Sequence, residues 1–585
     1  MAGHAEISPF RRLLRLLKLD RRDVAVVFIY TALAGLLTLA IPLAAQALVN
    51  TIAAGVFVQP LVVLTTLLFT GLLLTGLLRV AQFYLVELLQ QRVFARVAIQ
   101  LAAGVPRVQH DVLQYSYLPE LINRFFDVIK LQKSLAKLLL EGPAAMLQIV
   151  IGLMLMAIYS PLLLGFDLLI IAFLFFCAFV LGYRGVRTSL MESQEKYHVA
   201  GWLEDIARCH VSLKIDGAAD FLFTKTDDAV LDYLAARRKH FGILFRQASA
   251  NYLFQAFANA GILAIGGWLV IHNQLTLGQL VAAELVMVIL LAAIDKLVMM
   301  APDWYDLLTS LDKIGTVADL PQERSGGKPI PELPEGAAAV TCKNLTFGYS
   351  GQKSVLKQLN ARIIPGERVS LVGASGSGKS TLAAMICGLL TPTSGVIELN
   401  GVDVREADLS TLYDIAALVD DSDSIFEGTL EENITVGRQG ISNEDLRWAL
   451  KVTQLEEDVA LFEDGLQTRL VSAGMNISKG QIQRLLIARA IVDRPRLLIL
   501  DEAFSGIDER TKLAMLQALL APDLPWTVID ISHDADVVLR CDRVLVLEGG
   551  HIVESGEPLE LARNASSAFA KLFPEVVALV IASKL

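Results

Sequence analysis

Residues 367–381, ERVSLVGASGSGKST, form a pattern that can bind phosphate. An apolar run from Val369 to Val372 enters a glycine-rich loop and then a helical stretch, TLAAMICGLL. The pattern GxxxxGK[ST] between a strand and a helix is a P-loop, whose backbone N–H groups and helix start attract phosphate. Lys379 is expected to reach the β- and γ-phosphates, and the Ser380 hydroxyl to bind Mg²⁺. The predicted nucleotide-binding residues are Gly373, Ala374, Ser375, Gly376, Ser377, Gly378, Lys379, Ser380 and Thr381.

Two more apolar runs end in residues suited to hydrolysis. LLILDE (497–502) reads as a strand buried on both faces that ends in Asp501 and Glu502. Asp501 suits Mg²⁺, and Glu502 suits the base that orients or deprotonates an attacking water. TVIDIS (527–532) ends at His533, which we expect to contact the γ-phosphate. The sequence therefore predicts a site where water attacks the γ-phosphate of a bound nucleotide.

The residue pattern around these motifs predicts the strands and helices that position them. Beyond residue 336, β-branched runs alternate with helical stretches, which indicates an α/β domain over 337–585. The preceding stretch, 319–336, is dense in proline, glycine and charge and reads as a linker. Most of the apolar residues lie before it, within 23–318. We predict a membrane half followed by an α/β half.

Six segments in the first half approach the roughly 20 apolar residues that a spanning helix needs. They lie at about 24–48, 58–86, 144–160, 162–183, 252–272 and 277–300. Lys and Arg are absent from the short connectors near 49–60, 159–161 and 272–280 and frequent in the long ones, which places the long ones and both termini in the cytoplasm. The long connectors keep helical periodicity, so we expect the spans to continue into the cytoplasm and turn back near 115–128 and 210–223.

Bulk properties agree with a membrane protein and exclude some classes. The chain has 585 residues, of which 54% are hydrophobic, and its mean hydropathy is +0.52. A net charge of −10 argues against a nucleic-acid partner. The five cysteines show no metal-ligand spacing. Residues 1–22 have no signal-peptide pattern and predict an amphipathic helix on the inner membrane surface, in contact with lipids.

The ordered motifs resemble those of one family. The P-loop is followed by ISKGQIQRLLIARA, LLILDEA, SGID (505–508) and His533, a series similar to the nucleotide-binding domain of ABC transporters. With six spans in front, the chain resembles an ABC exporter half-transporter. This resemblance implies a six-helix all-α transmembrane domain with long cytoplasmic extensions, then an α/β P-loop ATPase domain with a helical subdomain. It also implies ATP and Mg²⁺ as cofactors and a second half-transporter as partner.

The resemblance assigns further roles by position. In such a dimer, ATP lies between the P-loop of one subunit and the signature motif of the other, here Ser478, Lys479, Gly480 and Gln481. Tyr349 matches the aromatic residue that stacks on adenine, with Phe347 as its rival. Asp508 matches the acidic residue of the loop that crosses the dimer interface.

Two departures from the family pattern fall at this site. Lys479 replaces a glycine of the usual LSGGQ, and its ammonium could join the phosphate shell, crowd it or face solvent. In LVDDSDSIFEGTLEENI, an alignment on Phe426 puts Asp421 where a catalytic and Mg²⁺-binding glutamine is usual. The departures fit a heterodimer with one degenerate site or a divergent homodimer. We favour the homodimer, because the chain keeps its own Lys379, Asp501 and Glu502.

The sequence of the membrane half gives less information about the transported substrate than the second half gives about ATP. Asp167 and Glu284 are ionisable residues within spans, whereas Asp295 and Lys296 are expected in the aqueous extension. The apolar surroundings suit an amphipathic substrate such as a lipid, peptide or drug-like molecule. No peptidase domain precedes the spans, which predicts an exporter that does not process its cargo. The sequence thus predicts an ATP-driven exporter or flippase in a bacterial inner (plasma) membrane, with its nucleotide-binding domain in the cytoplasm. The alternative is a membrane-anchored regulator or channel without transport.

Overall fold

The computed structural model describes residues 8–38, 40–53, 58–113, 118–159, 164–334, 336–349, 353–420, 425–522, 524–564 and 566–582. The chain divides into two compact units. The first comprises Met1–Val108 and Val112–Gln322, and the second comprises Gln109–Asp111 and Glu323–Leu585. Each unit is described by itself below.

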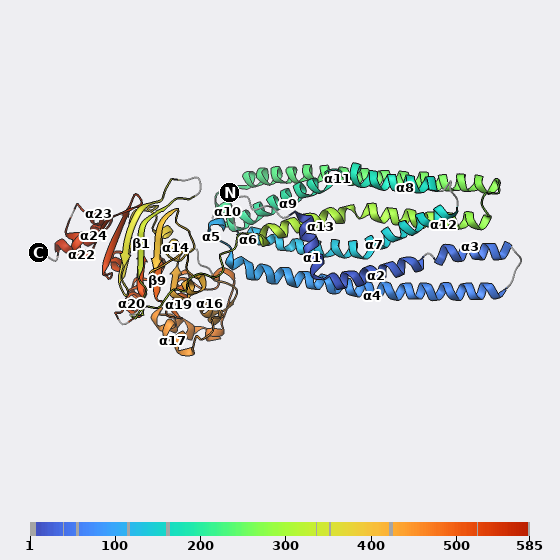
Figure 1. The fold of residues 1–585 in the computed structure, drawn as a ribbon. Helices are drawn as coiled ribbons and strands as arrows, with labels where there is room; N and C mark the ends of the chain where they lie inside the picture. Colours follow the sequence, from blue (N-terminus) through green and yellow to red (C-terminus); the bar gives the residue numbers. More distant parts are fainter. Residues whose placement is uncertain are drawn as a thin grey trace. The chain divides into compact units, whose positions relative to one another are not determined.

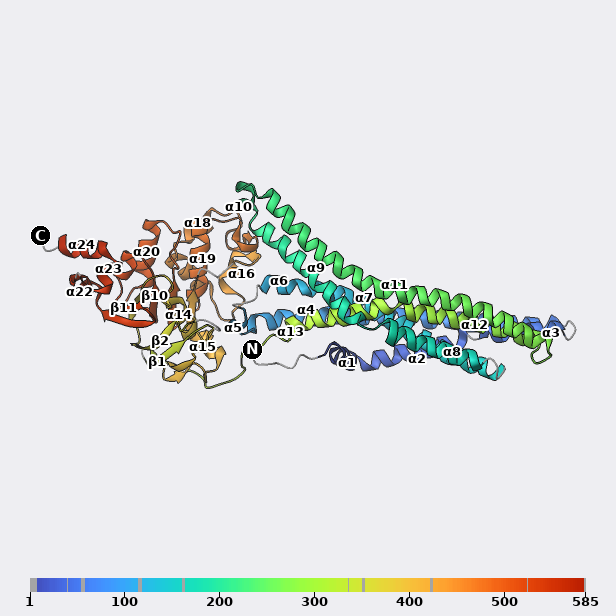
Figure 2. The same cartoon turned by 90° about the horizontal axis from the view of Figure 1, so that it is seen from above.

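The first unit is built from long helices that run side by side (Figures 1 and 2). Its longer helices are α1 (Pro9–Leu19), α2 (Arg21–Thr38), α3 (Ala40–Ala53), α4 (Val58–Gly104), α7 (Asp127–Tyr159), α8 (Leu164–Phe175), α9 (Gly185–Arg208), α11 (Ala219–Ile271), α12 (Leu277–Met299) and α13 (Ala301–Ala318). Among the described residues, six helical stretches are long and apolar enough to cross a membrane. The prediction of a six-span, all-helical membrane half is therefore confirmed.

Two of the spans continue far beyond the length that a membrane requires. Helix α4 has 47 residues and α11 has 53, whereas about 20 suffice to cross. Short elements join the extended helices, namely α5 (His110–Leu113), α6 (Leu118–Ile122) and α10 (His210–Ile215), with 3₁₀ turns at Val105–Arg107 and Asn123–Phe126. Helices α6 and α10 and the second 3₁₀ turn fall within the segments 115–128 and 210–223, where the sequence predicts the chain to turn back, whereas α5 and the first 3₁₀ turn precede them.

Apolar side chains hold the helices together, and one buried polar network lies among them. Asp295 is half-buried and accepts hydrogen bonds from Asn251 Nδ2 (2.7 Å) and Gln255 Nε2 (3.0 Å). The expectation that Asp295 lies free in water is wrong, because these two amides of α11 hold its carboxylate, which belongs to α12, against α11. Hydrogen bonds of this kind offset the cost of burying a carboxylate.

The N-terminal helix α1 packs against α13. Arg12 donates from Nη2 to Asp319 Oδ2 (2.7 Å) and from Nη1 to the carbonyl oxygen of Leu311 (3.3 Å). A β-carbon on Gly315 would be 2.1 Å from Arg12 Cζ, so only glycine leaves room for the guanidinium there. The amphipathic segment is thus helical and anchored by a charged side chain on its polar face.

The second unit contains two main sheets. The larger has the order β12-β11-β3-β10-β9-β6 and is parallel except for β12. Its strands are β3 (Arg368–Val372), β6 (Ala416–Val419), β9 (Leu497–Asp501), β10 (Thr527–Ile531), β11 (Arg543–Glu548) and β12 (His551–Gly556). The smaller sheet is antiparallel, in the order β2-β1-β4-β5, with β1 (Val340–Phe347), β2 (Leu356–Ile363), β4 (Ser394–Leu399) and β5 (Val402–Asp403).

Helices alternate with the strands of this unit, as the predicted α/β class requires (Figure 1). They are α14 (Lys379–Ile386), α15 (Leu409–Ile415), α16 (Leu430–Thr435), α17 (Asn443–Val452), α18 (Glu456–Leu461), α19 (Lys479–Ile491), α20 (Glu509–Leu519), α21 (Ala535–Val538), α22 (Pro558–Arg563), α23 (Ala568–Leu572) and α24 (Pro574–Ala582). The short strands β7 (Gly428–Thr429) and β8 (Arg469–Leu470) pair with each other beside α16. Helices α16 to α19 share a core that includes Leu430, Leu446 and Leu485.

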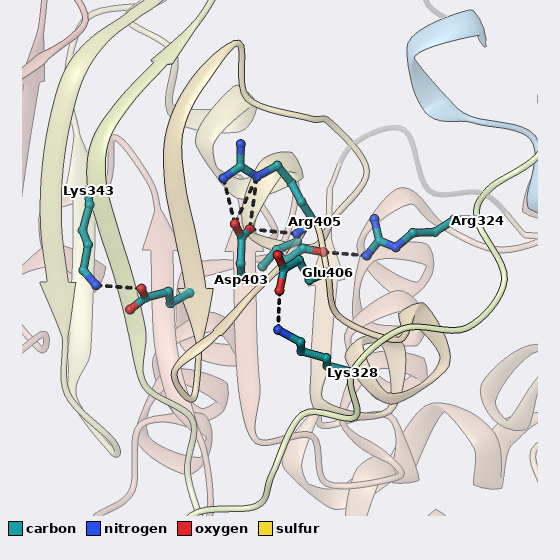
Figure 3. Close-up of polar contacts among 8 residues, drawn as sticks. Arg324, Lys328, Lys343, Asp403, Arg405 and Glu406 are labelled. Atoms are coloured by element: carbon teal, nitrogen blue, oxygen red, sulfur yellow. Dashed lines mark hydrogen bonds and ion pairs between the residues drawn. The ribbon is translucent and has the colours of Figure 1, made fainter.

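The stretch that reads as a linker packs on the second unit from residue 324 onward (Figure 3). Arg324 Nη2 donates to the carbonyl oxygens of Val404 and Ala407, both at 2.6 Å. Lys328 bonds Glu406 through its backbone N–H (2.8 Å) and its ammonium (2.6 Å). A chain segment with these contacts is fixed to the domain that follows it.

Candidate functional site

The P-loop is set up by the end of β3 and the start of α14. Gly376 (φ 78°) and Gly378 (φ 105°) adopt left-handed backbone conformations that favour glycine. A β-carbon on Gly378 would be 2.7 Å from Leu356 Cδ2, so a side chain there would collide with β2. The loop is therefore pressed against the smaller sheet.

Lys379 begins α14, and its ammonium reaches back across the loop. Nζ donates to the carbonyl oxygens of Gly373 (2.9 Å) and Ala374 (3.2 Å), and the side chain is buried. Burial lowers the pKa of Lys379, while the carboxylates of Asp501 and Glu502 oppose that shift. These two carboxylates thus lie within electrostatic range of the P-loop lysine.

Neighbouring strands bring the catalytic candidates together. Strands β9 and β10 are parallel, with Asp501 opposite Ile531, and the backbone N–H of Glu502 donates to Ile531 O (2.9 Å). Glu502 has a φ of 50°, a strained value for a residue with a side chain, of the kind that clusters at functional sites. A cavity of about 500 Å³ is lined by Glu502, Phe504, Ser505, Ser532, His533, Asp534, Ala535 and Glu575. Glu502 and His533 therefore face one space.

Several residues of that cavity are missing from the sequence-based prediction, and Phe504 and Glu575 are two of them. Phe504 follows Glu502 by two positions and is buried, whereas Glu575 is exposed on α24 near the end of the described chain. No motif marks Glu575, because a glutamate after a proline at a helix start is common. Asp534 lines the cavity as well and pairs with Lys512 of α20.

The candidate Mg²⁺ ligands fit the chemistry of that ion. Ser380 is exposed in the first turn of α14, and Asp501 ends β9. Magnesium commonly takes one or two carboxylates and completes its shell with phosphate oxygens and water. Among the described residues, no group of three or more His, Cys, Asp and Glu could hold a metal, so an ion here would depend on nucleotide oxygens. Asp421, predicted as a further ligand, lies outside the described residues.

Tyr349 and Phe347 have different environments. The Tyr349 hydroxyl lies 3.0 Å from Thr381 Oγ1, which places the half-buried ring beside α14. Phe347 is buried in the core, with its ring centroid 5.0 Å from that of Tyr349. Of the two rings, that of Tyr349 has more exposed surface on which a nucleotide base can stack.

The signature residues start α19. Ser478 is its N-cap: Ser478 Oγ accepts from Gln481 N–H (3.2 Å), and Gln481 Oε1 accepts from Ser478 N–H (2.8 Å). Gln481 Nε2 also donates to Asp458 (2.7 Å), so this amide is engaged within its own subunit. A β-carbon on Gly480 would be 3.0 Å from Gly506 O. The helix start thus abuts the 505–508 loop of its own chain, and Lys479 is exposed.

Asp508 ends that loop and caps the next helix. Its Oδ1 accepts from Thr511 N–H (3.0 Å) at the start of α20. This backbone hydrogen bond lowers the pKa of Asp508, so the carboxylate is charged at neutral pH.

Comparisons with known proteins identify both units. Residues 24–294 match the ABC transporter transmembrane region and residues 356–505 match the ABC transporter family. An uncharacterized ABC transporter ATP-binding protein YwjA of Bacillus subtilis is 34% identical over 54% of this chain and 56% of its own length. The transport/processing ATP-binding protein ComA of Streptococcus pneumoniae is 27% identical over 82% of this chain and 67% of its own.

A third relative and a solved structure complete the comparison. The leukotoxin translocation ATP-binding protein LktB of Mannheimia glucosida is 32% identical over 53% of this chain and 43% of its own length. The chain thus spans only about half of some relatives. A solved bacterial Atm1-family ABC exporter with ATP bound shares the fold with a TM-score of 0.83 at 23% identity, over 95% of this chain and 98% of that one. Together, the two family matches and their order show that the chain belongs to the ABC transporter family, as a half-transporter with its transmembrane region fused to its ATP-binding region.

Proposed function

We propose that this protein hydrolyses ATP to export or flip an amphipathic substrate out of the cytoplasm by alternating access. The observation that carries the proposal is the shared cavity of Glu502 and His533, with Lys379 in electrostatic range of Glu502. A base, a γ-phosphate contact and a phosphate-binding lysine are the parts that such hydrolysis needs. The described part of the chain also has six helices long enough to cross a membrane, through which hydrolysis can be coupled to transport.

Each residue has a defined task in this proposal. ATP supplies the bond to be cleaved, and Lys379 with the loop N–H groups of 373–378 holds its phosphates. Ser380 and Asp501 would hold Mg²⁺, which neutralises charge on the phosphates. Glu502 takes the proton of the attacking water, and His533 fixes the terminal phosphate for attack. Tyr349 would stack on the adenine.

A second half-transporter is the proposed partner, and we favour a homodimer. Each chain carries its own Lys379, Asp501 and Glu502, so neither subunit needs a catalytic residue that the other lacks. Ser478, Lys479, Gly480 and Asp508 would then contribute across the dimer. The proposed location is a bacterial inner membrane, with the second unit in the cytoplasm, because the relatives are bacterial.

The relatives favour a polypeptide among the possible cargoes. ComA is described as a transport/processing protein and LktB as a leukotoxin translocation protein. Lipid and drug-like molecules stay as alternatives within the same amphipathic class. A regulator or channel without transport is the competing function, and ATP turnover coupled to cargo distinguishes it.

The test is ATP hydrolysis by the protein in liposomes, measured with a panel of peptides, lipids and drug-like amphiphiles. We expect at least one to raise turnover and to accumulate inside inverted vesicles. Glu502→Gln serves as the control and should abolish both signals. If every amphiphile left turnover unchanged and none crossed, the regulator would be the better interpretation.

A further inference from the structure

An apolar cavity of about 840 Å³ lies inside the first unit, and all its lining residues belong to that unit. Its walls come from α1, α2, α7, the π-helix η3 (Phe176–Leu181), α11, α12 and α13. The wall residues Phe28, Met146 and Leu297 lie near the ends of spans that we expect on the cytoplasmic side, so we expect the cavity at the depth of the inner leaflet. Its size is within the range of ligand pockets, about 300–1,000 Å³.

The lining is almost wholly apolar and includes exposed residues. Among the described residues that line it, there is no Asp, Glu, Lys, Arg or His. Phe28, Met146 and Phe179 line it while remaining 46%, 52% and 64% exposed. A cavity walled by exposed apolar side chains at leaflet depth is open to lipid rather than to water.

One buried polar group interrupts this lining. Gln247 is 5% exposed, and its Oε1 is buried without a hydrogen-bond partner among the described residues. Its Nε2 donates to Cys177 O (3.1 Å) and to the Tyr305 hydroxyl (3.4 Å). Because a carbonyl oxygen can only accept, Cys177 fixes the amide orientation and leaves Oε1 as a free acceptor. An unpaired buried acceptor is destabilising unless something donates to it.

The backbone is shaped to bring these groups together. A β-carbon on Gly182 would be 3.0 Å from both Gln247 Nε2 and the Tyr305 hydroxyl, and one on Gly185 would be 2.5 Å from that hydroxyl. Both glycines follow the π-helix that carries Cys177. Single π-helical turns inside α-helices are frequent at functional sites. The polar corner of the cavity is therefore built by local features that a plain helix would not supply.

We propose that this cavity binds an uncharged lipid from the surrounding leaflet, with its acyl chain among the apolar walls and a hydroxyl or amide N–H donating to Gln247 Oε1. The absence of charged lining residues excludes an ionic head group inside the cavity, because an unpaired buried charge is strongly unfavourable. The orphan acceptor selects a head group that donates. This site goes beyond the proposed export function and holds whether or not its occupant is the cargo.

One residue of the cavity, Trp304, can report the binding of a lipid through its fluorescence. Trp304 lines the cavity and is 37% exposed, whereas Trp268, near the far end of α11, is 48% exposed and does not line it. Two full-length variants would keep only one of these tryptophans, with the others changed to Phe. In phosphatidylcholine nanodiscs, each is titrated with a monoacylglycerol brominated on its chain, or with the matching brominated methyl ester, which has no donor.

We expect saturable quenching of Trp304 by the monoacylglycerol at an apparent affinity about fivefold above that of the methyl ester, the range of one neutral hydrogen bond. Gln247→Met, which keeps the length and removes the acceptor, should abolish this preference. Gly142→Leu should abolish saturation, since Gly142 lines the cavity and a β-carbon there meets only Met300 Cε at 3.5 Å. Trp268 should be quenched equally by both probes in every variant.

Several results would overturn the proposal. The first is equal quenching of Trp304 by both probes, and the second is saturable quenching that survives Gly142→Leu. The third is no quenching of Trp304 at all, which is expected if a second subunit or ordered water fills the cavity. ATP turnover in the same nanodiscs is measured separately. Loss of turnover in the parent chain with quenching intact would count against the export function alone, and intact turnover without quenching against the lipid site alone.

Discussion

The side chain of Lys479 lies along Gly506: a β-carbon on Gly506 would be 3.4 Å from Lys479 Cδ and 3.7 Å from its Cε. The stem of the signature lysine therefore packs on the loop between Glu502 and Asp508 of the same subunit. Because the methylene groups of a lysine can cover backbone while its ammonium stays in water, this contact explains how the signature tolerates a lysine. It favours a role for the stem over a role for the charge.

Lys479→Met keeps that stem and removes the charge. We expect it to leave ATP-driven dimerisation in a Glu502→Gln background within about twofold of the parent, measured by analytical ultracentrifugation. Lys479→Gly should leave dimerisation unchanged or strengthen it, because a side chain near an interface glycine has little room. If the ammonium instead binds the partner's phosphate, both variants should weaken dimerisation about tenfold or more, the value of a charge-assisted hydrogen bond.

Glu502→Gln should lower ATP hydrolysis by about 10²-fold or more, because the amide cannot accept a proton from water. ATP binding should persist, since Lys379 and Ser380 are unchanged. Glu509→Gln, the same chemical change at an exposed position on α20, is the matched control and should keep its turnover. Near-normal turnover in Glu502→Gln would show that another group is the base.

Glu575→Gln should tighten ATP binding about two- to fivefold. Glu575 lines the cavity of Glu502 and His533, and its negative charge opposes the phosphates there. The change should shrink in high salt, because exposed charges are screened. Nucleotide affinity measured at two ionic strengths checks this, with Glu560→Gln on α22 as the control. A salt-independent effect would point to a structural role for Glu575.

Asp530 makes the stability of the second unit depend on pH. Its side chain is 1% exposed in β10, and burial, followed by the charges of Asp534 and Asp501, raises its pKa well above the ordinary value. The folded state therefore holds this proton more tightly than the unfolded state does. The contribution of Asp530 to the free energy of unfolding is complete below the ordinary pKa of about 3.9. It falls, by up to about 1.4 kcal/mol per pH unit, as the pH rises towards the raised pKa.

Asp530→Asn should remove this loss, so that its advantage over the parent grows as the pH is raised from about 5 to 8. The measurement is urea unfolding followed by the fluorescence of Trp526, which precedes β10 and is buried. Asp464→Asn, at an exposed position, controls for the loss of one charge. A constant difference between Asp530→Asn and the parent at every pH would contradict the assignment.

Local patterns account for what the sequence could predict. Glu502 and His533 each follow the end of an apolar strand, and Lys379 closes the glycine-rich loop that follows a third. The register of β9 with β10 makes the first two strand ends neighbours. Gln247 and Glu575 carry no such signal, because their significance depends on residues far away in the sequence. Gln247 meets Cys177 and Tyr305, 70 and 58 positions distant. The sequence predicts water around Asp295 because its side chain is charged. Only the packing of α11 shows that the amides of Asn251 and Gln255 lie next to it.

Helix α4 also has a mechanical consequence. At 1.5 Å per residue, its 47 residues make a rod of about 70 Å, and a membrane takes up only about 30 Å of it. The remaining 40 Å or so acts as a lever pivoting at the bilayer surface. A tilt of about 10° within the membrane displaces the far end by about 7 Å, more than one helical turn of about 5.4 Å. The bending stiffness of α4, rather than the strength of the contacts at its two ends, then limits how much of a movement is transmitted. A pair of glycines inserted near the exposed middle of the helix would lower that stiffness.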